Sequence, residues 1–149
     1  MLSKTSEYAL RSVVFLAENP ASSNPLQAIA ATTQVPPGYL SKVLQLLVRA
    51  GLLTSQRGLG GGFSLARPAE EMSVYEVVQA VDPIERILEC PLKLPEHREE
   101  LCALHRRLDD VMEMVEHSFR ITSVADLLKK PTFPKPLAAR PKRRKAPVD

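Results

Sequence analysis

The sequence predicts a mainly α-helical fold with one short β-hairpin and one long helix near its C-terminal end. Three observations support this class. Apolar residues recur every three or four positions in several segments between residues 5 and 128, which is the period of an α-helix. One glycine-rich stretch, Arg57–Gly62, lies between two short segments that alternate in the manner of strands. An apolar stripe then continues from Leu101 to Phe119, which is longer than the core of a small domain requires.

The first two helices are predicted from their apolar faces and their ends. Residues 5–18 carry one apolar face, formed by Leu10, Val13, Val14 and Ala17. Glu7 lies in the first turn of this helix, where the helix dipole favours a negative charge. Asn24 and Pro25 then supply an N-cap and a first helical residue for a short helix over residues 26–32. A tight turn leads from this helix into a third one.

The third helix, residues 37–50, has one apolar and one polar face. The apolar face consists of Leu40, Val43, Leu44 and Leu47. The opposite face carries short or hydrogen-bonding residues, namely Gly38, Ser41, Lys42, Gln45 and Arg49. Pro36 and Pro37 suit a helix start, and Gly51 suits the left-handed residue that ends a helix. Two helices joined by a tight turn, the second with a polar outer face, predict a helix-turn-helix.

A hairpin is predicted directly after this helix. Its strands include Leu53 and Ser55 before the turn and Phe63 and Leu65 after it, and its tip is Arg57–Gly62. A glycine-rich tip is slim enough to enter a groove, and its arginine supplies positive charge. Short polar side chains on a helix can reach base edges in the major groove of DNA, while an arginine can enter the minor groove. A glycine-rich surface hairpin alone is unspecific, but helix and hairpin together favour DNA binding.

The charge is unevenly distributed along the 149 residues. Residues 1–67 carry a net charge of +4, residues 68–128 carry −8 and residues 129–149 carry +7. A basic N-terminal module attached to an acidic one fits a protein that binds an anionic partner. No segment approaches the roughly 20 apolar residues of a membrane span, and the N-terminus has no signal-peptide pattern, so we expect a cytoplasmic protein. The two cysteines argue against a disulfide framework.

The second half is predicted to begin with a helix over residues 73–81, opened by the Ser-x-x-Glu pattern of a capping box. The longest helix is predicted from Pro95 to about Arg120. Its apolar stripe consists of Leu101, Leu104, Leu108, Val111, Met112, Val115 and Phe119. Such a stripe suits either packing within one subunit or a seam with a second copy. A last short helix, residues 124–128, is capped by Thr122 and Ser123.

Three units are therefore expected. Residues 1–82 form a winged helix-turn-helix domain, residues 83–128 form a loop and a long dimerisation helix, and residues 129–149 form a tail. The tail combines five prolines with eight basic residues, so it is expected to be disordered. Its residues Lys142 to Lys145 suit either nonspecific contact with DNA phosphates or solubility alone.

Three segments, in this order, resemble the Rrf-type winged helix-turn-helix transcriptional regulators, which include IscR-like and NsrR-like members. They are SEYALRSVVFLA, VPPGYLSKVLQLLVRAGLLTSQRGLGGGFSLARP and SVYEVVQAVDP. The resemblance covers about residues 1–128 and implies a homodimer that binds a two-fold symmetric operator in double-stranded DNA. It implies that Tyr39, Ser41 and Lys42 contact bases or phosphates, and that Arg57 enters the minor groove. The DNA-binding residues expected overall are Gly38, Tyr39, Ser41, Lys42, Gln45, Arg57, Gly58 and Gly60.

The resemblance also implies a sensor site. Cluster-binding members hold a 2Fe-2S cluster with three cysteines, of which Cys90 and Cys102 match the first and third, whereas the middle position is Glu96. Because 2Fe-2S centres can replace thiolates by other ligands, His105, Glu7 and Glu96 itself are candidates to complete the set. The alternatives are a reversible disulfide, a buried apolar Cys102, and a cluster-free member of the family.

We therefore expect a homodimeric regulator of transcription, a repressor, whose affinity for its operator is controlled by a 2Fe-2S cluster or by thiols. The alternative is a cluster-free winged-helix regulator, or a protein-interaction module, controlled by a partner protein or a metabolite. An enzyme is not expected, because Cys102 and His105 have no orienting third group. No membrane and no small-molecule substrate are expected as partners.

Overall fold

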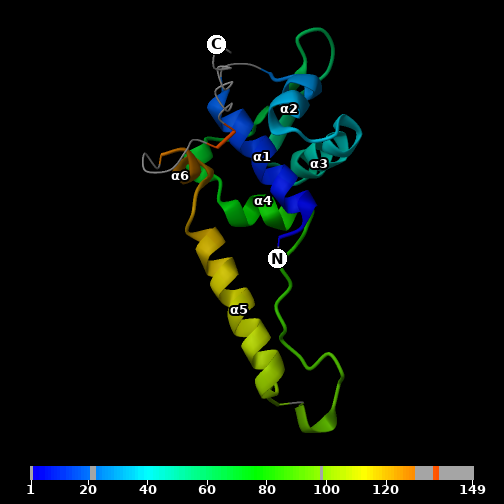
Figure 1. Cartoon of the computed structure of the whole chain (residues 1–149), viewed down its shortest axis with the longest axis vertical. Helices are drawn as coiled ribbons and strands as arrows, with labels where there is room; N and C mark the ends of the chain where they lie inside the picture. Colours follow the sequence, from blue (N-terminus) through cyan, green and yellow to red (C-terminus); the bar gives the residue numbers. More distant parts are fainter. Residues whose placement is uncertain (1, 21–22, 98, 130–135, 138–149) are drawn as a thin grey trace, which may run out of the picture.

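The computed structural model describes residues 2–20, 23–97, 99–129 and 136–137. A compact body of short helices carries the hairpin at one end, and one long helix projects from the opposite end (Figure 1). In chain order the elements are α1 (Lys4–Glu18), α2 (Leu26–Thr33), α3 (Pro37–Arg49), β1 (Leu53–Gln56), β2 (Gly62–Leu65), η1 (Ala69–Glu71), α4 (Val74–Val81), η2 (Pro95–His97), α5 (Ala103–Arg120) and α6 (Val124–Leu128).

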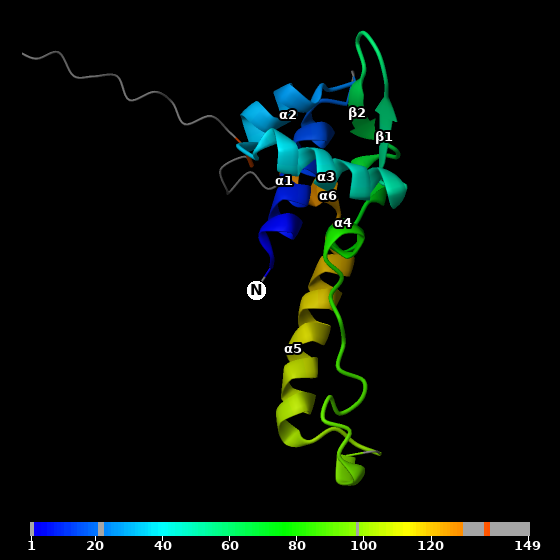
Figure 2. The same ribbon diagram turned by 90° about the vertical axis from the view of Figure 1, so that its right-hand side faces the viewer.

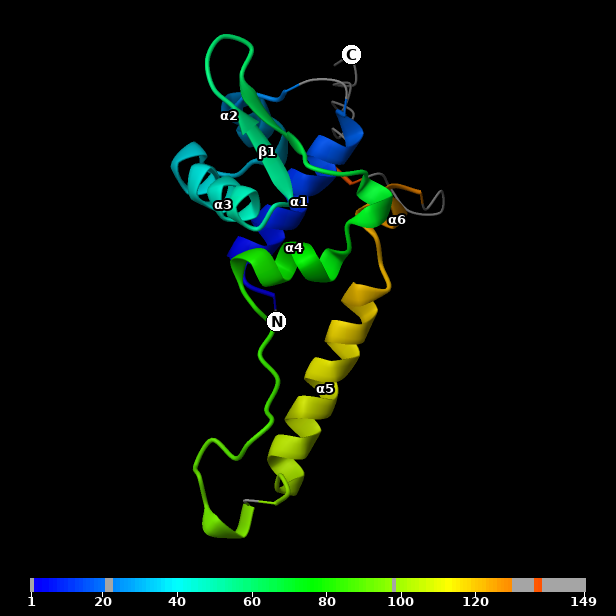
Figure 3. The same ribbon diagram turned by 180° about the vertical axis from the view of Figure 1, so that it is seen from behind.

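The body is built around α1, which contacts α2, α3, α4, α6 and β2. From behind, α4 lies between the rest of the body and α5 (Figure 3). The fully enclosed core side chains come from most of the body's helices, namely Val13, Leu16, Ile29, Leu40, Leu44, Leu47, Met72, Val77 and Val124. Each such aliphatic side chain contributes about 1.5–3 kcal/mol relative to exposure. Within the described residues, no helix has the length and apolar content needed to cross a membrane.

The structure confirms the predicted geometry of α3. Its apolar face is fully buried in the core, and its polar face remains at the surface. Pro36 is the N-cap and Pro37 the first helical residue, a position where the missing N–H leaves no bond unmade. Gly51 follows the helix with φ 74°, a left-handed conformation that suits glycine. Both helix ends are therefore set by local sequence.

The hairpin pairs β1 and β2 antiparallel, with Leu53 opposite Leu65 and Ser55 opposite Phe63. It is fixed to the body through Asn24, whose backbone N–H donates to Phe63 (2.9 Å) and whose carbonyl accepts from Phe63 (2.8 Å). The predicted N-cap role of Asn24 is therefore wrong, because Pro25 takes that position. Asn24 is instead recruited by the open edge of the hairpin, where unpaired backbone groups need partners.

Gly62 is expected to be essential for this attachment. Its φ is 155°, and a Cβ atom there would lie 2.2 Å from the carbonyl oxygen of Asn24. Gly62→Ala should therefore separate the hairpin from α2 and lower the melting temperature by about 4–8 °C or more, which corresponds to about 1 kcal/mol in a small domain. Gly38→Ala is the matched control, because nothing lies within 4 Å of its added methyl group. Thermal unfolding followed by circular dichroism measures both, and equal melting temperatures would contradict this expectation.

Two helices of the second half begin with capping boxes. Ser73 and Glu76 form the predicted box at α4, and Ser123 forms a second one with Asp126 at α6. The α6 segment packs on α1 and η1, with Val124 and Ala125 buried. This differs from the predicted division, which grouped residues 124–128 with the dimerisation helix. The apolar side chains of α6 complete the core of the body instead.

The long helix is shorter than predicted. It begins at Ala103 rather than Pro95, and Pro95–His97 forms a separate 3-10 turn. The residues from Glu96 to Glu100 include no apolar side chain that could anchor a helical turn on the body. None of the residues of α5 is buried, although one face of the helix is apolar. In this chain α5 is therefore a helix whose apolar face is largely uncovered.

The predicted disordered tail is described only at Lys129, Pro136 and Leu137. Leu137 packs against the edge of the core. Residues 130–135 and 138–149, with Lys142 to Lys145 among them, lie outside the described residues.

Candidate functional site

The polar face of α3 and the hairpin lie on one side of the body (Figure 2). Gly38, Tyr39, Lys42 and Gln45 are exposed along α3, and Ser41 is half-buried. The hairpin tip projects beyond α3 and is fully exposed at Arg57, Gly58, Leu59 and Gly60. Gly58 and Gly60 have φ values of 93° and 74°, which other residues adopt only with strain. The predicted DNA-binding residues therefore share one surface.

Tyr39 is held in place at the start of α3 by contacts with α1. Its hydroxyl forms a hydrogen bond of 2.6 Å with Thr5 Oγ1, and its ring packs edge-on against Tyr8 with centroids 5.7 Å apart. The residue nevertheless keeps 42% of its surface exposed. An aromatic side chain in this state is oriented in advance and still accessible to a ligand.

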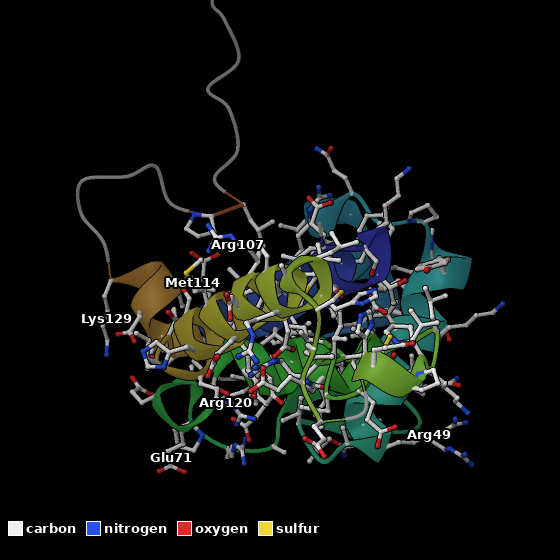
Figure 4. The ribbon with its side chains drawn as sticks, turned by 90° about the horizontal axis from the view of Figure 1, so that it is seen from below. Arg49, Glu71, Arg107, Met114, Arg120 and Lys129 are labelled. Carbon is white, nitrogen blue, oxygen red and sulfur yellow. The ribbon has the colours of Figure 1, made fainter. Side chains whose placement is uncertain are left out.

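A cleft of about 480 Å³ separates α3 from the hairpin. Gln45 and Arg49 line it from α3, while Ser55, Gln56 and Arg57 line it from the hairpin. Arg49 extends outward from the end of α3 (Figure 4). Two guanidinium groups on opposite walls suit a negatively charged backbone that passes between helix and hairpin.

Acidic residues are absent from this part of the chain. No Asp or Glu occurs between Glu18 and Glu70. Lys42, Arg49 and Arg57 form no ion pair with any acid in the described part of the chain, whereas several arginines elsewhere are paired. The paired ones include Arg11 with Glu7, Arg67 with Glu76, and Arg120 with Glu116. Cations without internal partners are available to bind an external anion.

The loop between α4 and α5 brings each cysteine next to a histidine. Cys90 Sγ lies 3.3 Å from His97 Nδ1, and Cys102 Sγ lies 3.3 Å from His105 Nδ1. The hydrogen bond from His97 lowers the pKa of the Cys90 thiol, as do the backbone N–H groups of Leu94 and Leu92, while desolvation opposes this. Cys90 is buried in a cavity of about 400 Å³ that is also lined by Lys93.

The predicted metal ligands are not assembled around one point. Glu7 lies on α1 and is paired with Arg11, while Glu96 lies in η2 and is exposed. No three His, Cys, Asp or Glu side chains within the described residues are placed to bind one ion. The donors that do meet are thiols and imidazoles, which suit zinc and iron-sulfur centres by type.

His97 is the neighbour of Cys90 that sequence reasoning missed, because Glu96 occupies the aligned position. The short η2 turn decides which of the two adjacent side chains faces the thiol. A histidine seven residues after Cys90 is the one signal that was present in the sequence.

Arg86 fastens the beginning of this loop to the middle of α5. Its guanidinium donates two hydrogen bonds of 2.7 Å to Asp109 and a longer one to Glu113. The Asp109 carboxylate also accepts from the Ile87 backbone N–H at 2.8 Å. Arg86 lowers the pKa of Asp109 to about 2, and Asp109 raises that of Arg86. This bidentate contact joins the sensor loop to α5.

The Arg86 contact should depend on pH and on Asp109. Because the pKa of Asp109 is lowered from 3.8 to about 2, the contact stabilises the loop above pH 4 and is lost as the pH falls towards 2. Asp109→Ala should speed hydrogen exchange at the Ile87 amide at least about tenfold at neutral pH. The neighbouring Asp110→Ala is the control, since Asp110 is exposed and makes no ion pair with a described residue. NMR-detected exchange measures both, and equal rates would show that the contact does not hold the loop.

Comparison with known proteins supports the same reading. The Rrf2 family profile, described as an iron-dependent transcriptional regulator, matches residues 2–130. The transcriptional repressor NsrR of Streptomyces coelicolor is 29% identical over 135 residues, covering 89% of this chain and 91% of that protein. IscR of Cereibacter sphaeroides is 39% identical over 84 residues, covering 54% of each. The solved structure of T. potens IscR matches with a TM-score of 0.71 and 25% identity, over 87% of this chain and 86% of that one.

These findings confirm the predicted fold and the predicted family. The two-stranded hairpin on a helical body is the wing of a winged-helix fold that the structural neighbours share. The relatives are regulators of transcription and not enzymes, as the sequence led us to expect. The chain belongs to the Rrf2 family of DNA-binding transcriptional regulators.

Proposed function

We propose that the chain is a homodimeric regulator that places α3 in the major groove of its operator and the hairpin tip in the adjacent minor groove. The observation that carries this proposal is the set of unpaired cations, Lys42, Arg49 and Arg57, on a surface without acidic residues. Phosphates attract such groups, and the release of counterions makes their binding depend on salt.

Each predicted residue has a physical role in this arrangement. Ser41 and Gln45 offer hydrogen-bonding groups to base edges, and the ring of Tyr39 is oriented for contact at the start of the helix. Gly38 keeps this helix end thin enough for close approach. Lys42 binds phosphate, while Arg57, carried by Gly58 and Gly60, enters the minor groove, where the potential is most negative.

A second copy of the chain is the proposed partner of α5. Leu104, Leu108 and Val111 lie on one face of α5 at helical spacing, and they are 64%, 43% and 39% exposed. A continuous apolar face of this length in water favours burial against an identical helix. Two copies related by a two-fold axis present two α3 helices to half-sites about one helical turn apart.

We further propose that the dimer acts as a repressor in the cytoplasm and that the redox state of the loop cysteines sets its affinity for DNA, directly or through a 2Fe-2S cluster. The paired thiols and imidazoles of the loop support redox control. The name of the Streptomyces relative, a transcriptional repressor, supports the direction. The Arg86 contact gives the loop a route to α5 and its seam.

Selection of duplexes from a random pool by the full-length chain tests this function. We expect recovery of a two-fold symmetric sequence, binding by two chains in sedimentation, and an affinity that falls steeply between 50 and 200 mM salt, as expected for roughly 6–10 phosphate contacts. Recovery of no preferred sequence, with weak binding equal to that of any basic protein, would contradict the proposal.

A further inference from the structure

The two cysteine–histidine pairs share one geometry. In each pair the sulfur and the Nδ1 nitrogen are 3.3 Å apart. A tetrahedral zinc-type ion, with bonds of about 2.3 Å to sulfur and about 2.0–2.1 Å to nitrogen, separates its sulfur and nitrogen ligands by about 3.5 Å. Each pair therefore already has nearly the spacing of two adjacent ligands of one metal.

Both pairs lie at the same end of the molecule, where the loop meets the free end of α5 (Figure 1). Only four residues separate His97 from Cys102. At about 3.3–3.6 Å per residue this connection spans at most about 18 Å, so the pairs can join by a movement confined to the loop. Cys90 and His97 already line a cavity, so one half of the site is shaped before any ligand enters.

The carboxylates expected from the sequence are poorer candidates. Glu7 is engaged by Arg11 on α1, in the body of the molecule, whereas the pairs lie beyond the other end of α5. Glu96 is exposed and contacts neither thiol among the printed geometry of the loop, while its neighbour His97 bonds Cys90. Two thiolates and two neutral imidazoles also balance the charge of a divalent ion, which added carboxylates would exceed.

We propose that Cys90, His97, Cys102 and His105 form one Cys2His2 metal site, and that His97 takes the place of both Glu7 and Glu96. The site binds a metal centre that accepts two thiolates and two imidazoles, either a single zinc-type ion or a 2Fe-2S cluster with Rieske-type ligands. This inference rests on the proposed function, whose sensor loop it completes within one subunit.

Metal binding by the full-length chain tests this assignment. After removal of bound metal under nitrogen, Co²⁺ is added as a spectroscopic probe, and iron with sulfide is added in a parallel sample. We expect either one tetrahedral, thiolate-bound Co²⁺ per chain or matched iron and acid-labile sulfide with a visible spectrum. The first result assigns a single ion and the second a cluster. Binding of neither would overturn the proposal.

His97→Ala and Glu96→Ala form the decisive pair of variants, since they alter adjacent residues of the same short turn. His97→Ala should weaken metal binding at least about tenfold and change the visible spectrum, because one direct ligand is removed. Glu96→Ala should leave both unchanged. Equal binding by wild type and His97→Ala, or an equal loss in both variants, would overturn the role of His97. Far-ultraviolet circular dichroism establishes that both variants are folded.

Selection of operator sequences by the metal-free chain separates the two proposals. Sequence-specific DNA binding without a Cys2His2 site would refute only the metal assignment. A metal site in a chain that selects no DNA sequence would refute only the proposed operator binding.

Discussion

Replacing Leu108 by glutamate is expected to convert the dimer into a monomer and to lower operator affinity by at least about 100-fold. Leu108 lies in the middle of the exposed apolar face of α5, between Leu104 and Val111. A charge placed there would be buried without a partner in the proposed seam, which strongly opposes association. Each monomer then binds one half-site alone and loses the gain from binding two linked half-sites.

Met114→Glu is the matched control for this variant. Met114 is also a large apolar residue of α5 and is 62% exposed, but it projects from the edge of the helix that faces away from α4 (Figure 4). Analytical ultracentrifugation and DNA titration should show a dimer with unchanged affinity for this control. If Leu108→Glu stayed dimeric, or if Met114→Glu dissociated equally, the proposed seam would be misplaced on α5.

Arg57→Ala is expected to weaken operator binding about tenfold or more, and to reduce the dependence of log Kd on log salt concentration by about 1 for each site lost. The guanidinium of Arg57 stands at an exposed tip and has no acidic partner within the described residues. Its removal therefore changes no internal ion pair of the described structure. The loss of affinity should come from DNA contacts alone, with the melting temperature unchanged.

The control for a general loss of charge is Arg107→Ala. Arg107 is likewise exposed and forms no ion pair in the described structure, but it lies on α5, far from the hairpin (Figure 4). Fluorescence anisotropy on a labelled operator at several salt concentrations compares the two variants. Equal affinities for Arg57→Ala and the wild type would show that the hairpin tip does not contact DNA.

Local patterns in the sequence determined most of the fold. Helix α3 was predictable because its four apolar residues, its two prolines and Gly51 all act within a few residues of one another. The capping box of α4 and the glycine-rich hairpin are equally local. The basic reading surface followed from composition, because residues 19–69 contain no acid at all.

The remaining features depend on contacts between distant segments, and only the tertiary structure decided them. Asn24 pairs with Phe63 because the hairpin edge needs a partner, although its local pattern suits a helix cap. Helix α5 begins at Ala103 because nothing holds the preceding polar residues on the body. His97 rather than Glu96 faces Cys90, and Arg86 meets Asp109, through the path of an irregular loop. Periodicity describes regular elements, so it carries no information about which side chains such a loop brings together.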